Sequence, residues 1–173
     1  INVPGVKMQR ASGFTGPLVI VANGGSLTLS ELTMNGGCGT LPALLTNNNS
    51  RYSSTYATGS AKAPLILVNT GGDLNFTDGT VFDYNSNKPN TNSSGAFAPS
   101  GYIGLGGAVY CNGTMTMTGG LIQHCEAQSG GGVYIENGSF RLNGGTIDHN
   151  YARNILPFNS TAATYRTNAG GGV

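Results

Sequence analysis

Residues 106–120 read GGAVYCNGTMTMTGG, and residues 131–145 repeat the pattern as GGVYIENGSFRLNGG. Each stretch has a glycine pair, an apolar run, an Asn-Gly turn, an alternating segment and a second glycine pair. Earlier in the chain, PLVIVANGGSLTL at residues 17–29 matches PLILVNTGGDLNF at residues 64–76 without a gap. The chain therefore contains an internal repeat, and its two later units begin 25 residues apart.

The middle segment of each unit alternates between apolar and polar residues, which is typical of a β-strand with one buried face. Glycines between the segments supply turns with positive φ. Three short strands per unit predict a coil of a right-handed parallel β-helix, in which equivalent strands pair about 4.8 Å apart. The residues predicted to face inward are Leu27, Leu29, Leu74, Phe76, Met115, Met117, Phe140 and Leu142. Those predicted to face outward are Thr28, Asn75, Thr116 and Arg141.

The composition agrees with an all-β stack and excludes several classes of protein. Charged residues make up 9% of the chain, against about 25% in an average domain, and like charges in a stacked ladder repel. The net charge is +1 and the Lys and Arg residues are scattered, so no nucleic-acid partner is expected. No apolar run reaches the length of about 18 residues that a membrane span needs.

The chain length of 173 residues fits one domain. We take residues 1–16, which show no amphipathic pattern, as an N-terminal segment that leads into the repeats. Residues 17–173 are predicted to form one β-helix domain of about four coils. Because residues 170–173 resemble the start of a unit, this domain is expected to continue beyond Val173.

Insertions lengthen three of the predicted coils, over residues 39–62, 86–105 and 151–169. All three follow the third strand of a unit, so they should leave the stack at one corner and form one face. Long loops on a rigid scaffold often carry function. This insertion face is therefore the candidate surface for glycans or cell-surface ligands, with exposed decoration as the alternative.

Two short motifs resemble those of a known group of surface proteins. Residues 106–109 resemble the GGA[ILV] repeat of the polymorphic outer-membrane proteins and similar adhesins. Residues 82–85 resemble their FxxN repeat, and residues 147–150 are a close variant. The resemblance implies a right-handed β-helix at the cell surface, used in adhesion or surface structure. Cys125 replaces the motif's Asn, and residues 35–38 lack the pattern.

Parallel β-helices also include polysaccharide-cleaving enzymes such as pectin lyases, which cluster carboxylates on one face. Here only Glu31 and Asp78 fall at equivalent positions of neighbouring coils, and Gln123 separates Asp83 from Asp148. We therefore predict that the protein is not an enzyme. A polysaccharide-active enzyme or a carbohydrate-binding β-helix is the alternative.

His124 and His149 are predicted to occupy the same position in adjacent coils, with Tyr84 one coil earlier. Two histidines about 5 Å apart suit a shared metal ion. No third ligand is evident in the sequence beyond Asp148 or Cys125, so neither a metal nor another cofactor is predicted.

The chain has three cysteines. Cys111 is predicted to point inward and Cys125 lies at the far corner of the same coil, so these two are the candidate disulfide pair. The alternative is that both are buried free thiols. The odd count leaves at least one unpaired thiol, with Cys38 outside the candidate pair.

Six Asn-X-Ser/Thr sequons occur in segments that the repeat places at the surface. Attachment of a bulky glycan requires such exposure. The alternative is that the Asn-Gly sequons are only turns, in a bacterial protein that is never glycosylated in this way. The candidate sites are Asn48, Asn75, Asn92, Asn112, Asn137 and Asn159.

These observations predict an extracellular structural or adhesive glycoprotein, exposed at the cell surface as a segment of a surface protein or as a filament subunit. The open ends of a β-helix are strand edges, and strand edges associate. We therefore expect other copies or other subunits to stack on the ends of the helix.

Overall fold

The computed structural model describes residues 1–39, 59–91, 97–98, 101–152 and 171–173. These residues form β-strands joined by turns, without a helix. It follows that the described chain has no helix long and apolar enough to cross a membrane. Most of the predicted insertions at residues 39–62 and 151–169, and part of the one at residues 86–105, lie outside the described residues.

The strands form three parallel sheets and one short antiparallel pair. Sheet 1 contains β2 (Val19–Val21), β4 (Ile66–Val68), β10 (Val109–Cys111) and β13 (Val133–Ile135). Sheet 2 contains β1 (Asn2–Gln9), β3 (Ser26–Asn35), β5 (Asp73–Phe76), β6 (Val81–Asp83), β11 (Thr114–Gln123) and β14 (Ser139–Asp148). Sheet 3 contains β7 (Ser86–Asn87), β12 (Glu126–Ala127) and β15 (Tyr151–Ala152). The antiparallel pair is β8 (Asn90–Thr91) with β9 (Phe97–Ala98).

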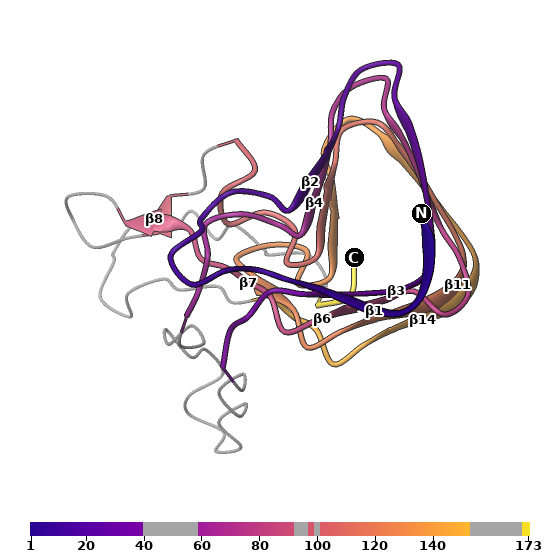
Figure 1. Ribbon diagram of the computed structural model, residues 1–173. Helices are drawn as coiled ribbons and strands as arrows, with labels where there is room; N and C mark the ends of the chain where they lie inside the picture. The colour runs from indigo at the N-terminus through magenta and orange to yellow at the C-terminus, as the bar shows by residue number, and fades with distance from the viewer. Residues whose placement is uncertain (40–58, 92–96, 99–100, 153–170) are drawn as a thin grey trace.

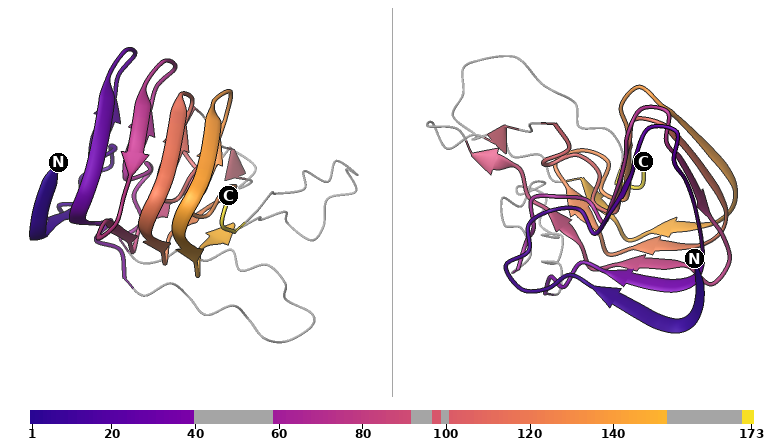
Figure 2. Two further views of the ribbon diagram at one scale, coloured as in Figure 1. Left: turned by 90° about the vertical axis from the view of Figure 1, so that its right-hand side faces the viewer. Right: turned by 45° about the horizontal axis from the view of Figure 1, so that its top comes forward.

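The chain passes through the sheets in the same order four times. We call these passes repeat 1 (β2 and β3), repeat 2 (β4 to β7), repeat 3 (β10 to β12) and repeat 4 (β13 to β15). They lie side by side in chain order from the N-terminal to the C-terminal end of the stack (Figure 2). Viewed along the stack, the superposed repeats enclose a triangular core (Figure 1). The prediction of an all-β fold is confirmed.

The registers between neighbouring strands follow the sequence repeat. Val19 pairs with Ile66 and Ser26 pairs with Asp73, as the alignment without a gap predicts. Repeats 3 and 4 differ in one detail, because Tyr110 pairs with Tyr134, 24 residues later, whereas Thr114 pairs with Ser139, 25 residues later. The turn between the first two strands is therefore one residue longer in repeat 4.

The structure corrects the predicted number and place of the strands. The second and third strands were expected to be separate, yet β3, β11 and β14 are each continuous over 10 residues, and only repeat 2 splits them into β5 and β6. A register shift near the second glycine pair bends β11 relative to β14 without ending either strand. Sheet 3 was not predicted, because its two-residue strands carry no periodicity and partly lie in the segments assigned to insertions.

The N-terminal segment also differs from its prediction. β1 lies along β3, and Val6 to Gln9 pair with Leu32 to Asn35. The register of β1 against β3 shifts at Pro4 and Gly5, where Gly5 has a φ of 72°, and this shift hides the alternation of the strand in the sequence. Thus part of residues 1–16 belongs to sheet 2.

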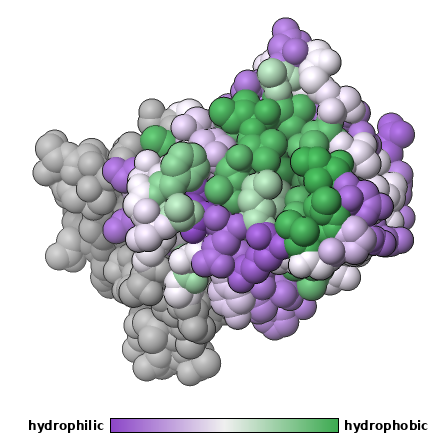
Figure 3. Space-filling model, in the orientation of Figure 1, coloured by the Kyte–Doolittle hydropathy of each residue, from purple (hydrophilic) through white to green (hydrophobic). Residues whose placement is uncertain are grey.

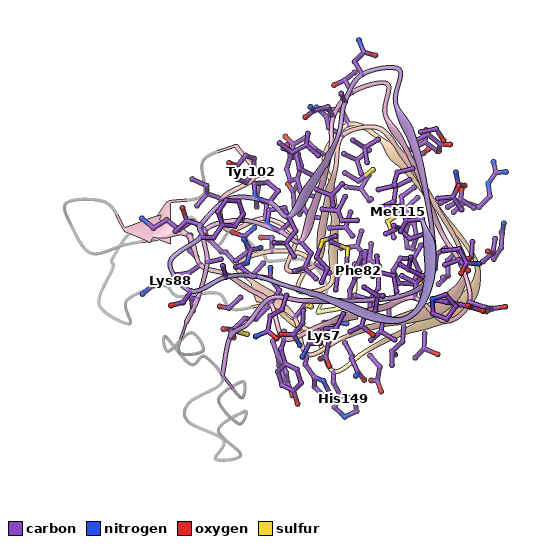
Figure 4. All side chains as sticks on the ribbon, viewed as in Figure 1. Lys7, Phe82, Lys88, Tyr102, Met115 and His149 are labelled. Atoms are coloured by element: carbon purple, nitrogen blue, oxygen red, sulfur yellow. The ribbon has the colours of Figure 1, made fainter. Side chains whose placement is uncertain are left out.

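The predicted inward rows form the core. Leu74, Phe76, Met115 and Met117 are all fully buried, and Phe76 packs edge to face on Phe82 with the ring centroids 4.6 Å apart. Phe82 and Met115 lie inside the triangle, whereas His149 lies outside it (Figure 4). The most exposed member of these rows is Leu142 at the C-terminal end of the stack, where 54% of the residue is accessible to solvent.

Candidate functional site

Three adjacent rows of side chains mark the corner where sheet 2 gives way to sheet 3, and we call this region the corner. In repeats 2, 3 and 4, three successive residues supply one member to each row, and repeat 1 contributes to the first row alone, so the rows run along the stack. The first row contains Asn35, Asp83, Gln123 and Asp148, the second contains Tyr84, His124 and His149, and the third contains Asn85, Cys125 and Asn150.

The second row turns the chain through an unusual backbone conformation. Tyr84, His124 and His149 have φ of 47°, 48° and 48°, in the left-handed region that few residues other than glycine adopt. Their rings face outward: Tyr84 and His124 stack with their centroids 4.8 Å apart, and His124 and His149 are tilted by 45° with their centroids 5.9 Å apart. The prediction that the three residues share one position is confirmed.

Each histidine of the second row contacts a carboxylate of the first row. His124 Nδ1 lies 3.0 Å from Asp83 Oδ1, and His149 Nδ1 lies 2.7 Å from Asp148 Oδ2. Gln123 lies between the two acids in register, as predicted, and its amide is 3.5 Å from Asp83 Oδ2. Hydrogen bonds from the backbone N–H and the ring of His149 lower the pKa of Asp148. The corner therefore presents two His–carboxylate pairs to solvent.

The third row points into the protein and links neighbouring repeats. The amide of Asn150 donates to Ile122 O at 2.8 Å and accepts from the backbone N–H of Cys125 at 3.0 Å. Asn85 likewise donates to Ala63 O at 3.0 Å. Because the side-chain amides satisfy backbone groups that a sharp corner leaves unpaired, the third row stabilises the corner.

Two buried charged residues behind the corner had no signal in the sequence pattern. Arg10 is 5% exposed, and its guanidinium donates to the carbonyl oxygens of Gly16 and Pro64 and to Asn85 Oδ1. Burial lowers the pKa of Arg10. Glu126 is fully buried and accepts a 2.7 Å hydrogen bond from the hydroxyl of Ser86. Since these residues lie where the sequence shows no periodicity, only the tertiary structure reveals them.

Cys38, Cys111 and Cys125 are free thiols in the structure, so the candidate Cys111–Cys125 bridge is not formed there. Cys111 is fully buried, as its predicted inward direction requires. Burial raises the pKa of all three thiols, and that of Cys38 rises to about 12. Because the thiolate is the reactive form, these cysteines are poor nucleophiles at neutral pH.

The six sequon asparagines have different surroundings. Asn137 is exposed, whereas Asn75 and Asn112 are half-buried. Asn75 donates to Asp73 Oδ2 at 3.0 Å, and the side-chain oxygen of Asn112 is buried without a partner among the described residues. Glycosylation remains a prediction at all six positions. The other three, Asn48, Asn92 and Asn159, lie outside the described residues.

Glu31 and Asp78, the candidate carboxylate pair, are both exposed, and the backbone N–H of Glu31 donates to Asp78 O at 3.2 Å. A cavity of about 240 Å³ lies elsewhere, lined by residues 9–15, 36–37 and 59–60. Within the described chain, no group of three or more His, Cys, Asp or Glu side chains is placed to hold a metal ion.

The corner thus combines two His–carboxylate pairs at the surface with a layer of buried polar side chains beneath them. The whole chain was also compared with known proteins. It matches no protein-family model, no curated protein and no solved structure.

Proposed function

We propose that the chain is an extracellular structural or adhesive protein, built as a right-handed parallel β-helix whose copies stack end to end. The observation that carries this proposal is the apolar surface that the described residues leave uncovered at both ends of the stack. A stiff rod assembled from such units has a structural role, and its side loops are available to bind glycans or cell-surface ligands.

The C-terminal end of the stack exposes residues that are buried in every inner repeat. Leu142 is 54% exposed, whereas its partner Met117 in repeat 3 is fully buried. Phe140 and Ile147 are half-buried at the same end. Among the described strands, β14 pairs with β11 alone, so its outer edge offers unpaired backbone groups to a further strand.

The N-terminal end also presents a hydrophobic surface. In the view along the stack from this end, hydrophobic side chains form a continuous area over the triangular core (Figure 3). Val6 is 49% exposed on β1, and Leu18 and Leu27 are half-buried. Single exposed apolar residues are normal, but a continuous apolar area marks an interaction site.

The two ends differ from each other, so contact between them is heterologous. Such contact leaves one free end of each kind after every addition and generates an open filament. Apolar burial supplies about 25 cal/mol per Å² of covered surface, which makes the ends the strongest candidate interface on a chain with 9% charged residues. The β14 edge of sheet 2 in one copy would meet the β1 edge of sheet 2 in the next.

Sedimentation of the purified chain over a wide range of concentrations tests the proposal. We expect association that grows with concentration into a series of species without a fixed final size. Electron microscopy of the concentrated protein should then show narrow filaments.

Leu142→Lys is the diagnostic variant, because it places a charge on the C-terminal apolar surface. Asn143→Lys is the matched control, since it adds the same charge at the adjacent exposed position of β14. We expect Leu142→Lys to abolish association and Asn143→Lys to leave it unchanged. A chain that stays monomeric at every concentration, or equal association of both variants, contradicts the proposal.

A further inference from the structure

We propose that His124 and His149 together bind one divalent transition-metal ion, such as Zn²⁺, Ni²⁺ or Cu²⁺, through their Nε2 atoms. Imidazole nitrogen is a preferred ligand of these ions. The site does not depend on the stacking of copies, because both histidines belong to one chain.

The first argument is the hydrogen bonding of the two rings. Each Nδ1 lies within hydrogen-bond distance of a carboxylate, Asp83 for His124 and Asp148 for His149. A carboxylate accepts, so each Nδ1 carries the proton and the neutral ring keeps its lone pair on Nε2. A histidine that binds a metal typically has this arrangement, in which the carboxylate fixes the tautomer and makes the other nitrogen more basic.

The second argument is the spacing of the two rings. Their centroids are 5.9 Å apart and their planes are tilted by 45°. Two imidazoles that share a tetrahedral ion at about 2.0–2.1 Å place their centroids roughly 5–6 Å apart. The observed centroid spacing of 5.9 Å falls within this range.

The third argument is the rigidity and accessibility of the pair. Both residues have a φ of 48°, and each directly follows one of two neighbouring paired strands, His124 after β11 and His149 after β14. The side chain of His124 is 32% exposed and that of His149 is 63% exposed, so an ion reaches both from solvent. Asp83 and Asp148 offset the charge of the ion.

Water would complete the coordination, because no third ligand among the described residues joins the pair. Such an open site keeps positions for an exchangeable ligand. Tyr84, the third member of the row, carries no imidazole and stacks on the opposite face of His124 from His149.

Calorimetric titration of the untagged protein with Zn²⁺ tests the proposal cleanly, because the chain has only these 2 histidines. We expect one Zn²⁺ per chain, and no comparable binding of Mg²⁺, which prefers oxygen ligands. His124→Asn and His149→Asn should each weaken Zn²⁺ binding at least about 10-fold through loss of a ligand. Asparagine is the replacement of choice, because it tolerates the left-handed backbone.

Tyr84→Asn is the matched control, since it makes the same replacement in the same row at a φ of 47° and removes no metal ligand. It should leave Zn²⁺ affinity unchanged. Asp148→Asn keeps both imidazoles and should weaken binding about 10- to 100-fold, as expected for loss of a supporting carboxylate.

Three results would overturn the shared site: no Zn²⁺ binding by the native chain, equal binding by the double histidine variant, or single variants that each keep full affinity. A measurement on the unaltered chain guards against misfolded variants. Zn²⁺ should protect both histidines together from modification by diethyl pyrocarbonate, and failure to protect either one contradicts the proposal.

Discussion

Repeat 3 lies between repeats 2 and 4, whereas repeat 4 is covered on one side by repeat 3 and on the other by little of the described chain beyond residues 171–173. The two repeats share the same pattern of glycines and alternating residues. Even so, Met117 is fully buried and its partner Leu142 is 54% exposed. A residue's position in the repeat therefore sets its direction, and the neighbouring repeats set its burial.

The largest expected difference between the two repeats is the cost of removing a core side chain. Met117→Ala should lower the free energy of unfolding by about 2–5 kcal/mol, because it leaves a cavity in a packed row. Leu142→Ala should cost about 0.5 kcal/mol or less in the dilute protein, since the side chain is already largely in solvent. Denaturant unfolding of both variants measures the difference. Equal costs would show that repeat 4 is covered in solution.

A substitution at Gly107 disrupts the contact between repeats 3 and 4 directly. A Cβ at this residue would lie 1.8 Å from the backbone oxygen of Gly131, which cannot move without displacing repeat 4. We expect Gly107→Ala to lower stability by about 1–3 kcal/mol. Gly172→Ala is the matched control, because the nearest atom to its added Cβ is Ile147 Cγ2 at 3.5 Å, an ordinary van der Waals contact. Thermal unfolding that ranks the control as the more damaging change would contradict this account.

The third row of the corner gives a pH-dependent difference, since repeat 3 has Cys125 where repeat 4 has Asn150. Burial raises the pKa of Cys125 in the folded protein above its unfolded value, so the folded state holds the proton more tightly. The associated stability is present below the unfolded pKa, about 8.5, and is lost as the pH rises toward the folded pKa.

Urea unfolding between pH 8 and pH 11 measures this effect. The free energy of unfolding should fall with a slope of up to about 1.4 kcal/mol per pH unit for this thiol, and Cys125→Ala should flatten the slope. Cys38, with its pKa raised to about 12, and Cys111, whose pKa burial also raises, contribute in the same direction and remain in that variant. An unchanged slope in Cys125→Ala would place the alkaline loss elsewhere.

The smallest expected difference between the two repeats is in the glycosylation of the sequons at the first turn. Asn137 is exposed in repeat 4, whereas Asn112 in repeat 3 is half-buried with its side-chain oxygen covered. After secretion from a eukaryotic host, we expect a glycan on a larger share of chains at Asn137 than at Asn112, so Asn137→Gln should remove more glycan mass than Asn112→Gln. Intact mass with and without glycosidase provides the readout, and a glycan on Asn112 alone would reverse the expected order.

Much of the stack and part of the corner are predictable because strands of neighbouring repeats pair in register. The match of residues 17–29 to residues 64–76 predicts the pairing of Val19 with Ile66, and the common spacing predicts the ring stack of Tyr84 and His124. The contacts of the histidines with Asp83 and Asp148 were harder to predict from the sequence, because the position of Nδ1 depends on the side-chain rotamer. Arg10 could not be found at all, because its partners lie as far away as Pro64 in the chain.

The sequence by itself determined the repeat, the direction of the core side chains on the alternating segments and the rows that run along the stack. Alternation and glycine spacing are local properties, and they specify which way a strand faces. The tertiary structure alone decided how many strands are continuous, where β1 lies and which equivalent residues are covered. Those outcomes depend on pairing and burial between segments far apart in the chain, and a local pattern carries no information about what lies beyond it.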